Sequence, residues 1–255
     1  MAMQSYLFLV LVTLITLSTC LPQALPATSI QTRDFLDILN AILEGVPGLE
    51  GNVNDIANLI TTTEQAIADA ADIQITYNEL SGPCKEYTII FARGTSEPGN
   101  VGVIVGPPFF EALKAVVGSG NVAVQGVNDY PAEVGGFLEG GDPGASAEMA
   151  VLIQDALNQC PNTHLVVSGY SQGGQVVHDA TALLSSATAA KISSVVIFGD
   201  PDNGTPVANV SPSKVLVICH DGDNICEGGA LILLPHLTYA TDAVTAAGFV
   251  VAASA

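Results

Sequence analysis

The chain contains no tryptophan and very few basic residues. Six Lys and Arg side chains stand against 25 Asp and Glu, so the formal net charge of the 255 residues is −19. Nucleic acids and anionic membrane surfaces are both bound through Lys and Arg. The composition therefore argues against either as a partner. The lack of tryptophan also argues against a carbohydrate site, because such sites stack sugar rings on aromatic side chains.

Long hydrophobic runs are missing except for one near the N-terminus. Residues 7–17 form the apolar core LFLVLVTLITL, which is too short to span a bilayer. Small and turn-forming residues follow up to Ala27, as in secretory signal peptides. We therefore assign residues 1–27 to a signal peptide, cleaved somewhere between Cys20 and Ala27. The remaining protein is expected to be secreted, extracellular and without stable membrane insertion.

Cysteine is scarce, and no two cysteines have the Cys-x-x-Cys spacing of a zinc site. Four remain after the signal peptide, namely Cys84, Cys160, Cys219 and Cys226. An even number in an exported chain predicts disulfides. Cys84 and Cys160 each precede a predicted strand, whereas Cys219 ends a strand at the opposite edge of the sheet. This layout favours the pairs Cys84–Cys160 and Cys219–Cys226 among three possible connectivities.

Residues 28–81 form a region of their own, with nine acidic side chains and a single arginine. Apolar residues recur at helical spacing over residues 35–43 and 56–67. Pro47-Gly48 and Gly51-Asn52 separate the two halves. We expect two short amphipathic helices, either as a pro-segment or as an N-terminal addition, whose apolar stripes are packing surfaces.

From Cys84 onward, predicted strands and helices alternate. Strands are expected at residues 87–92, 122–124, 195–198 and 215–218, and another begins at Leu165. Helices are expected at 107–117, 143–158, from the end of the Leu165 strand to about 190, and from 237 onward. The strands are continuous Val and Ile runs, which indicates burial on both faces and hence parallel pairing. We predict an α/β fold, a three-layer sandwich whose central, mostly parallel five-stranded sheet is flanked by helices.

The strand at Leu165 runs directly into a Gly-x-Ser-x-Gly motif formed by Gly169, Ser171 and Gly173. In a nucleophile elbow, a serine stands on a sharp strand-to-helix turn, and its neighbours two residues away must be nearly free of side chains. The helix that follows directs its free N–H groups and positive dipole end towards a developing oxyanion. The alternative is an ordinary glycine-rich turn. Residues further along the chain favour Ser171 as a nucleophile.

A serine nucleophile needs a histidine base, and the chain offers four. His164 lies at the wrong end of its strand, and His178 lies two turns along the helix after the elbow, so we expect both to be structural. His220 is a weak rival, next to Cys219. His236 follows every strand, which gives the chain order Ser, Asp, His of α/β-hydrolases. We therefore predict His236 as the base.

The base needs a rigid carboxylate to hold its tautomer. Asp200, Asp202, Asp221 and Asp223 all follow the carboxyl ends of predicted strands, where catalytic groups gather in such sheets. A Cys219–Cys226 bridge would make the loop that carries Asp221 and Asp223 rigid. The residues alone do not separate these two candidates.

Four stretches in order resemble the fungal cutinase family: residues 91–100 (FARGTSEPGN), 169–173 (GYSQG), 219–226 (CHDGDNIC) and 235–237 (PHL). The resemblance implies a cutinase-like α/β-hydrolase domain over residues 82–255. It places the acid at Asp223 and an oxyanion hole at the backbone N–H of Gln172 and at Thr95, where many relatives carry serine. The same two disulfides are implied. Residues 28–81 are longer than the leader that the resemblance suggests.

The resulting hypothesis is a secreted serine esterase that acts on cutin-type polyester and short-chain esters. Its expected partners are an insoluble polyester or a small ester, with no metal or cofactor, and we expect a monomer. The aliphatic residues Leu231, Ile232 and Leu233 suit an acyl or waxy substrate. Acetylxylan esterase is the alternative within the same chemistry. A non-catalytic secreted binding protein is the alternative of a different class, and the Ser, His and Asp candidates argue against it.

Two further features complete the expectations. Arg93 is interpreted as a buried side chain that ties loops together. Asn203 and Asn209 each begin an Asn-x-Ser/Thr glycosylation sequon, although a proline directly follows each sequon.

Overall fold

The computed structural model describes residues 27–254, so the predicted signal peptide lies outside the described residues except for Ala27. Five parallel strands form the central sheet in the order β3-β2-β4-β5-β6. Their bounds are Tyr87–Ala92 (β2), Val122–Gly126 (β3), His164–Tyr170 (β4), Ser194–Phe198 (β5) and Val215–Ile218 (β6). The predicted fold class is thereby confirmed.

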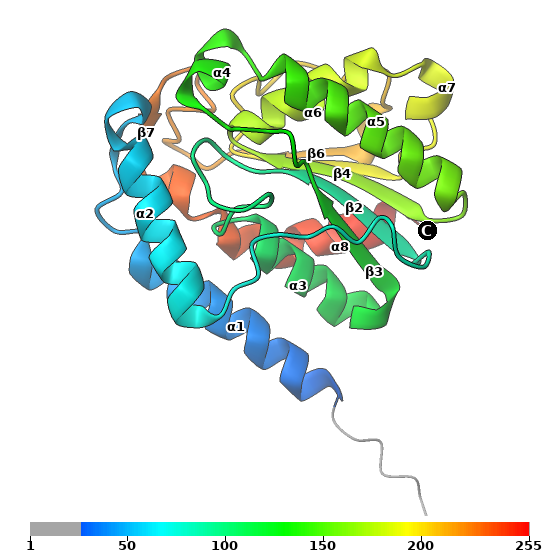
Figure 1. The fold of residues 1–255 in the computed structure, drawn as a ribbon, viewed down its shortest axis with the longest axis horizontal. Coiled ribbons are helices and arrows are strands. Elements are labelled where there is room, and N and C mark those ends of the chain that lie inside the picture. Colours follow the sequence, from blue (N-terminus) through cyan, green and yellow to red (C-terminus); the bar gives the residue numbers. More distant parts are fainter. Residues whose placement is uncertain (1–26, 255) are drawn as a thin grey trace, which may run out of the picture.

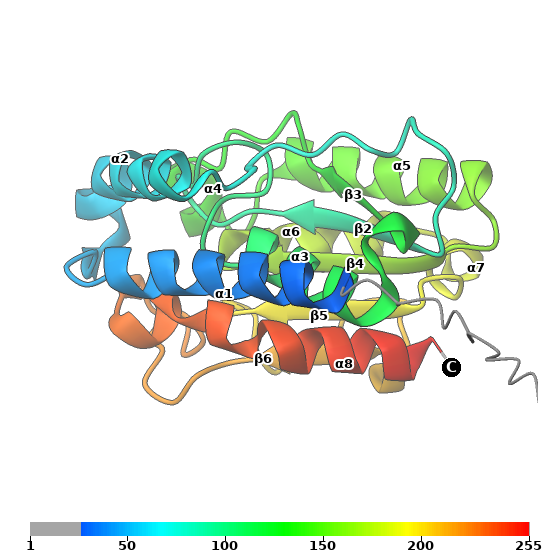
Figure 2. The same cartoon turned by 90° about the horizontal axis from the view of Figure 1, so that it is seen from below.

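Helices cover both faces of this sheet (Figure 2). One layer consists of α1 (Ala27–Gly45), α3 (Gly106–Val117) and α8 (Ala243–Ala253), and the other of α5 (Pro143–Gln159) and α6 (Gln172–Leu183). Successive residues of β2 alternate between the layers, with Ile89 and Phe91 in one core cluster and Ile90 and Ala92 in the other. Burial of each large apolar side chain contributes about 1.5–3 kcal/mol, which is consistent with strands that are mostly apolar and contain no Asp, Glu, Lys or Arg.

The N-terminal region forms two amphipathic helices, as predicted, but each is 19 residues long and extends beyond the predicted range. The helix α2 spans Val53–Ala71 and begins with Asn52 as its N-cap, whose side chain accepts a hydrogen bond from Asn54 N at 3.1 Å. Just before it, β1 (Gly51–Asn52) pairs antiparallel with β7 (Leu231–Ile232). This pairing holds α2 beside the loop that precedes His236 (Figure 1).

Two helix predictions differ from the structure. The helix after the elbow ends at Leu183, because Leu184 has extended backbone and Ser185 caps a separate helix, α7 (Ser186–Ala189). The last α-helix begins at Ala243, not at 237. The remaining elements are α4 (Val134–Glu139) and the 3-10 turns η1 (Ser119–Asn121), η2 (Pro212–Lys214), η3 (Leu234–Leu237) and η4 (Tyr239–Asp242).

Both disulfides of the favoured connectivity are present. Cys84–Cys160 links the segments that lead into the neighbouring strands β2 and β4, with 5.4 Å between its Cα atoms. Cys219–Cys226 closes a short loop directly after β6, with 6.1 Å between its Cα atoms. Within residues 27–254, no helix combines the length and apolar character that crossing a membrane requires.

Candidate active site

Ser171 stands at the turn between β4 and α6 in a backbone conformation that non-glycine residues rarely adopt. Its φ is 55° and its ψ is −123°. The turn is so tight that a Cβ on Gly169 would lie 2.2 Å from the Gly173 oxygen, and one on Gly173 would lie 2.0 Å from the Ala92 oxygen. Strain of this kind persists where the surrounding structure imposes it, and it is frequent at active sites. The elbow therefore presents the Ser171 hydroxyl at the carboxyl end of the sheet.

A chain of hydrogen bonds joins the serine, histidine and aspartate candidates. His236 Nε2 lies 2.9 Å from Ser171 Oγ, and His236 Nδ1 lies 2.9 Å from Asp223 Oδ2. The structure therefore brings together three residues that are separated by 13 to 65 positions in the sequence. In this geometry the imidazole can accept the serine proton at Nε2 while its Nδ1–H donates to the carboxylate.

Asp223 is held as an ionised acceptor. Tyr239 donates its hydroxyl proton to Asp223 Oδ2 at 2.6 Å, and Ile225 N donates to Oδ1 at 3.0 Å. Burial opposes the charge, but the hydrogen bond and charge of His236, with those of Tyr239 and Ile225, hold the pKa of Asp223 below its ordinary value. The carboxylate is therefore charged and fixed in orientation at neutral pH.

Two tyrosines that the sequence analysis did not single out support the histidine. The ring of Tyr170 stacks on His236 at 5.1 Å, and its hydroxyl donates to the His236 main-chain oxygen at 2.9 Å. Tyr239 meets the imidazole edge-on at 6.0 Å. Tyr170 lies inside the Gly-x-Ser-x-Gly motif and Tyr239 lies three residues after His236. Their closeness in the sequence to Ser171 and His236 was therefore the one signal that could have identified them.

Two groups near Ser171 can donate to an oxyanion. Gln172 is the first residue of α6, and the first N–H groups of a helix have no partner within it. Thr95 Oγ1 is buried and has no hydrogen-bond partner in the structure. The side chain of Gln172 is itself anchored, because its Oε1 accepts from Tyr130 at 2.7 Å and its Nε2 donates to the Glu133 oxygen at 2.8 Å.

The helix α2 covers this site. Ser171 is 4% exposed and His236 is 1% exposed. The cavity beside them has a volume of only about 10 Å³. Its lining comprises Ile60 and Glu64 from α2 together with Thr95, Glu97, Tyr170, Ser171, Ile232, His236 and Leu237. The apolar stripe of α2 is a packing surface, as predicted, and the surface on which it packs includes the cavity beside Ser171.

The other candidate bases and acids have different partners. His178 Nε2 lies 2.9 Å from Asp200 Oδ2, and His220 Nε2 lies 2.6 Å from Asp242 Oδ2. His164 lies against the ring of Tyr87. These histidines are structural, in keeping with the interpretation of the sequence for His164 and His178.

The two remaining acid candidates, Asp221 and Asp202, form no hydrogen bond with His236 within the described residues, in which Asp223 accepts from that imidazole. Asp221 is exposed. Asp202 lies with His178 and Asp200 in a group whose potential ligand atoms are within 4.8 Å of one another. The His178–Asp200 hydrogen bond accounts for two members of this group.

Of the three residues expected to line the substrate site, Ile232 lines the cavity beside Ser171. Leu231 is 44% exposed, and Leu233 is not among the cavity's lining residues. The alternation follows from the short strand β7, in which neighbouring side chains point to opposite sides.

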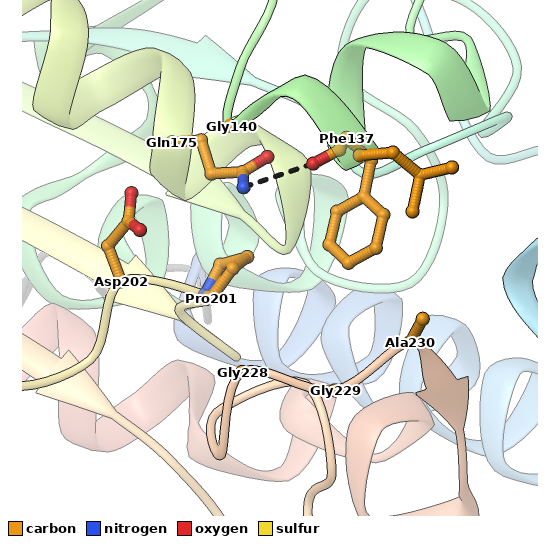
Figure 3. A pocket seen from close by; sticks show the side chains of 9 residues that line it. Phe137, Gly140, Gln175, Pro201, Asp202, Gly228, Gly229 and Ala230 are labelled. Carbon is orange, nitrogen blue, oxygen red and sulfur yellow. Dashed lines mark hydrogen bonds between the residues drawn. The ribbon is translucent and has the colours of Figure 1, made fainter.

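A larger cavity of about 360 Å³ lies one helical turn further along α6 (Figure 3). It is bounded by α4, by the loop after β5 and by the glycine-rich segment before β7. Its lining residues are Phe137, Leu138, Gly140, Gln175, Pro201, Asp202, Gly228, Gly229 and Ala230. Gln175 reaches α4 by donating to the Phe137 oxygen at 3.3 Å, which joins two walls of the cavity.

Arg93 ties loops together, as interpreted from the sequence. Its Nε donates to the Glu97 main-chain oxygen at 2.7 Å and its Nη2 to the Pro131 oxygen at 3.3 Å. Its guanidinium also lies over the ring of Tyr130, 5.0 Å from the centroid. Arg93 therefore fixes the loop that carries Thr95 without lining the catalytic cavity.

Comparisons with known proteins bear on this site. The family model described as Cutinase matches residues 83–254. A cutinase of Pyrenopeziza brassicae is 54% identical over 200 residues, which cover 78% of this chain and 97% of that protein. A cutinase of Botryotinia fuckeliana is 60% identical over 167 residues, which cover 66% and 82%. The structure of Trichoderma reesei cutinase in complex with a phosphonate inhibitor has a TM-score of 0.74 and 48% identity, and covers 87% of this chain and 99% of that one.

The parallel sheet, the elbow serine and the linked histidine and aspartate define a serine hydrolase with the α/β-hydrolase fold. The matches then identify the family. The chain belongs to the cutinase family and is a carboxylic ester hydrolase. An acetyl xylan esterase structure is also similar, with a TM-score of 0.52 at 20% identity, and this likeness extends to the fold alone.

Proposed function

We propose that the chain is a secreted serine esterase that hydrolyses the carboxylic ester bonds of cutin-type polyesters and of short-chain esters. The observation that carries the proposal is the continuous hydrogen-bond chain from Ser171 through His236 to Asp223 at a strained elbow. Relatives named cutinase, from 54% to 60% identical, support the polyester as the substrate class.

In this proposal, Ser171 Oγ attacks the ester carbonyl while His236 Nε2 accepts its proton. Asp223 holds the imidazole in the required tautomer and stabilises its positive charge. The Gln172 N–H and Thr95 donate to the oxyanion of the tetrahedral intermediate. His236 then protonates the leaving alcohol, and a water activated by the same imidazole releases the acid from Ser171. Every step uses groups of this chain and water.

The N-terminal region is proposed to remain part of the folded enzyme. Glu50 Oε1 accepts from Leu234 N at 2.9 Å, and Thr61 Oγ1 donates to the Ser96 oxygen at 2.7 Å. Apolar residues of α1 and α2 belong to the same core cluster as α3 and α8. The solved Trichoderma reesei structure covers 87% of this chain, and residues 82–255 alone would amount to only about two thirds of it. Intact mass of the secreted protein tests this, with a start near residue 28 expected and a start near 82 contradicting it.

Secretion is supported by the predicted signal peptide and by two disulfides, which form in oxidising compartments. We expect a monomer that binds an insoluble polyester or a small ester. If sugars are attached, Asn203 is the better acceptor, because it is exposed. The side-chain nitrogen of Asn209 instead donates to the main-chain oxygens of Thr181 and Leu184.

A substrate panel tests the proposed function. Purified enzyme is given p-nitrophenyl acetate, butyrate and palmitate, cutin and acetylated xylan. We expect turnover of the short esters and release of hydroxy acids from cutin, with little release of acetate from xylan. Faster deacetylation of xylan than hydrolysis of cutin would favour the acetylxylan esterase alternative, and no turnover of any ester would favour a binding protein.

A further inference from the structure

A glutamate interrupts the apolar face of the helix that covers the active site. The buried residues of α2 are Val53, Ile56, Ile60, Glu64, Ile67 and Ala68. Glu64 is the one acidic side chain among them and is 1% exposed. Glu64 lines the same small cavity as Thr95 and Ser171. The proposed hydrolytic mechanism makes no use of it.

The neighbour of Glu64 is a second buried carboxyl group, that of Glu97. Glu97 Oε2 accepts from Gly94 N at 2.7 Å, while its Oε1 accepts from Val103 N at 3.0 Å and Ile104 N at 3.1 Å. Three main-chain donors thus fix Glu97 as an acceptor in the wall of the site. These hydrogen bonds hold the Glu97 carboxylate in place when α2 packs against it.

Two carboxyl groups can share a hydrogen bond only if one carries a proton. Burial first, and then the charge and hydrogen bond of Glu97, raise the pKa of Glu64 well above its usual range. Because Glu97 already accepts three main-chain hydrogen bonds, we assign the proton of this pair to Glu64. Its Oε2 is buried and has no hydrogen-bond partner, so no second donor offsets a negative charge there.

The other ionisable groups that line this cavity are Tyr170 at the end of β4 and His236 in η3. Arg93, from the loop after β2, donates to the main-chain oxygen of Glu97 and not to the Glu97 carboxylate. Burial first, and then the charge of Glu97, raise the pKa of Tyr170 well above its ordinary value, so the phenol is neutral. Among these neighbours, Glu97 is the charge that acts on Glu64.

We propose that Glu64 is a proton-dependent latch, which ties α2 to Glu97 over Ser171 while it is protonated and releases α2 when it ionises. The inference rests on the proposed function, because it makes access to Ser171 depend on the position of α2. In the open state, the carboxyl group is in water, with an ordinary pKa near 4.5. The closed state is fully favoured below that pH and is lost as pH rises through the raised pKa. Each pH unit in that window weakens it about tenfold.

The first test follows α2 itself and needs no activity. Hydrogen exchange of the α2 amides is measured by mass spectrometry between pH 5 and pH 8 in the Ser171→Ala background, after correction for intrinsic exchange. We expect protection of residues 53–71 to fall by tenfold or more as pH rises. Glu64→Gln should keep protection constant, because its amide donates to Glu97 at every pH. Asp69→Asn is the matched control, since Asp69 is exposed on the same helix, and it should behave like the wild type.

The second test measures access to the nucleophile in the enzyme with Ser171 intact. Diethyl p-nitrophenyl phosphate labels an active-site serine covalently, and the labelling rate is followed from pH 5 to pH 8. Glu64→Gln should label at least tenfold more slowly than Asp69→Asn at pH 8 and at a similar rate at pH 5. Identical pH profiles for both variants, or α2 protection that is independent of pH in the Ser171→Ala protein with Glu64 intact, would overturn the latch. Absence of labelling at Ser171 in every variant would instead overturn the proposed function.

Discussion

At the residue scale, the loop closed by Cys219–Cys226 contains two aspartates with opposite environments. Asp223 is 1% exposed and accepts hydrogen bonds from His236, Tyr239 and the main chain of Ile225. Asp221 lies two positions earlier in the same loop and is exposed to solvent. Substituting each aspartate in turn therefore distinguishes two roles: orienting the imidazole of His236, or only adding negative charge to the loop.

We expect Asp223→Asn to lower kcat by about four orders of magnitude, because an amide in this place favours the wrong imidazole tautomer, as in serine proteases. Asp221→Asn should retain kcat within about twofold, since the charge of an exposed side chain is screened by water and salt. Initial rates on p-nitrophenyl butyrate at pH 8 measure both. A larger loss for Asp221→Asn would assign the acid to Asp221.

At the element scale, the two disulfides differ in what they constrain. Cys84–Cys160 joins positions 76 residues apart beside the neighbouring strands β2 and β4. Cys219–Cys226 spans only 7 positions. The chain-entropy model assigns about 4.5 kcal/mol to the long loop and about 2.4 kcal/mol to the short one. The short bridge is nevertheless closer to the chemistry, because Asp223 lies inside its loop.

Replacing Cys84 and Cys160 by Ala should therefore lower the melting temperature strongly, with little change in the rate of the protein that remains folded. Replacing Cys219 and Cys226 should lower kcat at a temperature where the protein is still folded, since a displacement of about 1 Å can cost about a hundredfold in rate. Calorimetry and initial rates on both double variants check this. An unchanged kcat in the second variant would show that packing alone holds the Asp223 loop.

Most elements could be predicted because their signals are local. The apolar runs of β2 and β6 are found at the predicted residues, β5 begins one residue earlier than predicted, and Pro143 marks the start of α5. The break after Leu183 could not be predicted, because apolar and small residues continue through it. The stripe of α2 predicted a helix that packs, but periodicity does not say which surface it covers. Glu64 within that stripe was the one local sign that the covered surface is unusual.

In the site, too, some residues could be predicted from local signals and others could not. The contact between Ser171 and His236 could be predicted from motif and chain order, whereas the contact of Asp223 with His236 needed the resemblance to separate it from Asp221. Tyr239 could not be assigned, because its contact with Asp223 depends on how η4 packs against the loop after β6. Residues that act through tertiary contacts leave no periodic signal in the chain.

At the scale of the whole molecule, the net charge of −19 dominates the electrostatics. Self-repulsion among many like charges destabilises the compact state, and salt screens it with a Debye length of about 30 Å at 0.01 M and about 8 Å at 0.15 M. We expect the melting temperature at pH 8 to rise between 10 mM and 150 mM NaCl. The kcat on a neutral short ester should not change, because the buried triad is screened much less. A melting temperature that falls with salt would show that attractive ion pairs outweigh the repulsion.

The proposed function depends on the hydroxyl group of Ser171. The elbow holds this residue at the carboxyl end of the sheet, and α2 covers it. The most direct measurement is the kcat of Ser171→Ala on p-nitrophenyl butyrate, together with its melting temperature. We predict a loss of about six orders of magnitude, by analogy with loss of the nucleophile in subtilisin, and an essentially unchanged melting temperature. Turnover near the wild-type rate in a folded Ser171→Ala protein would contradict the assignment of Ser171 as the nucleophile.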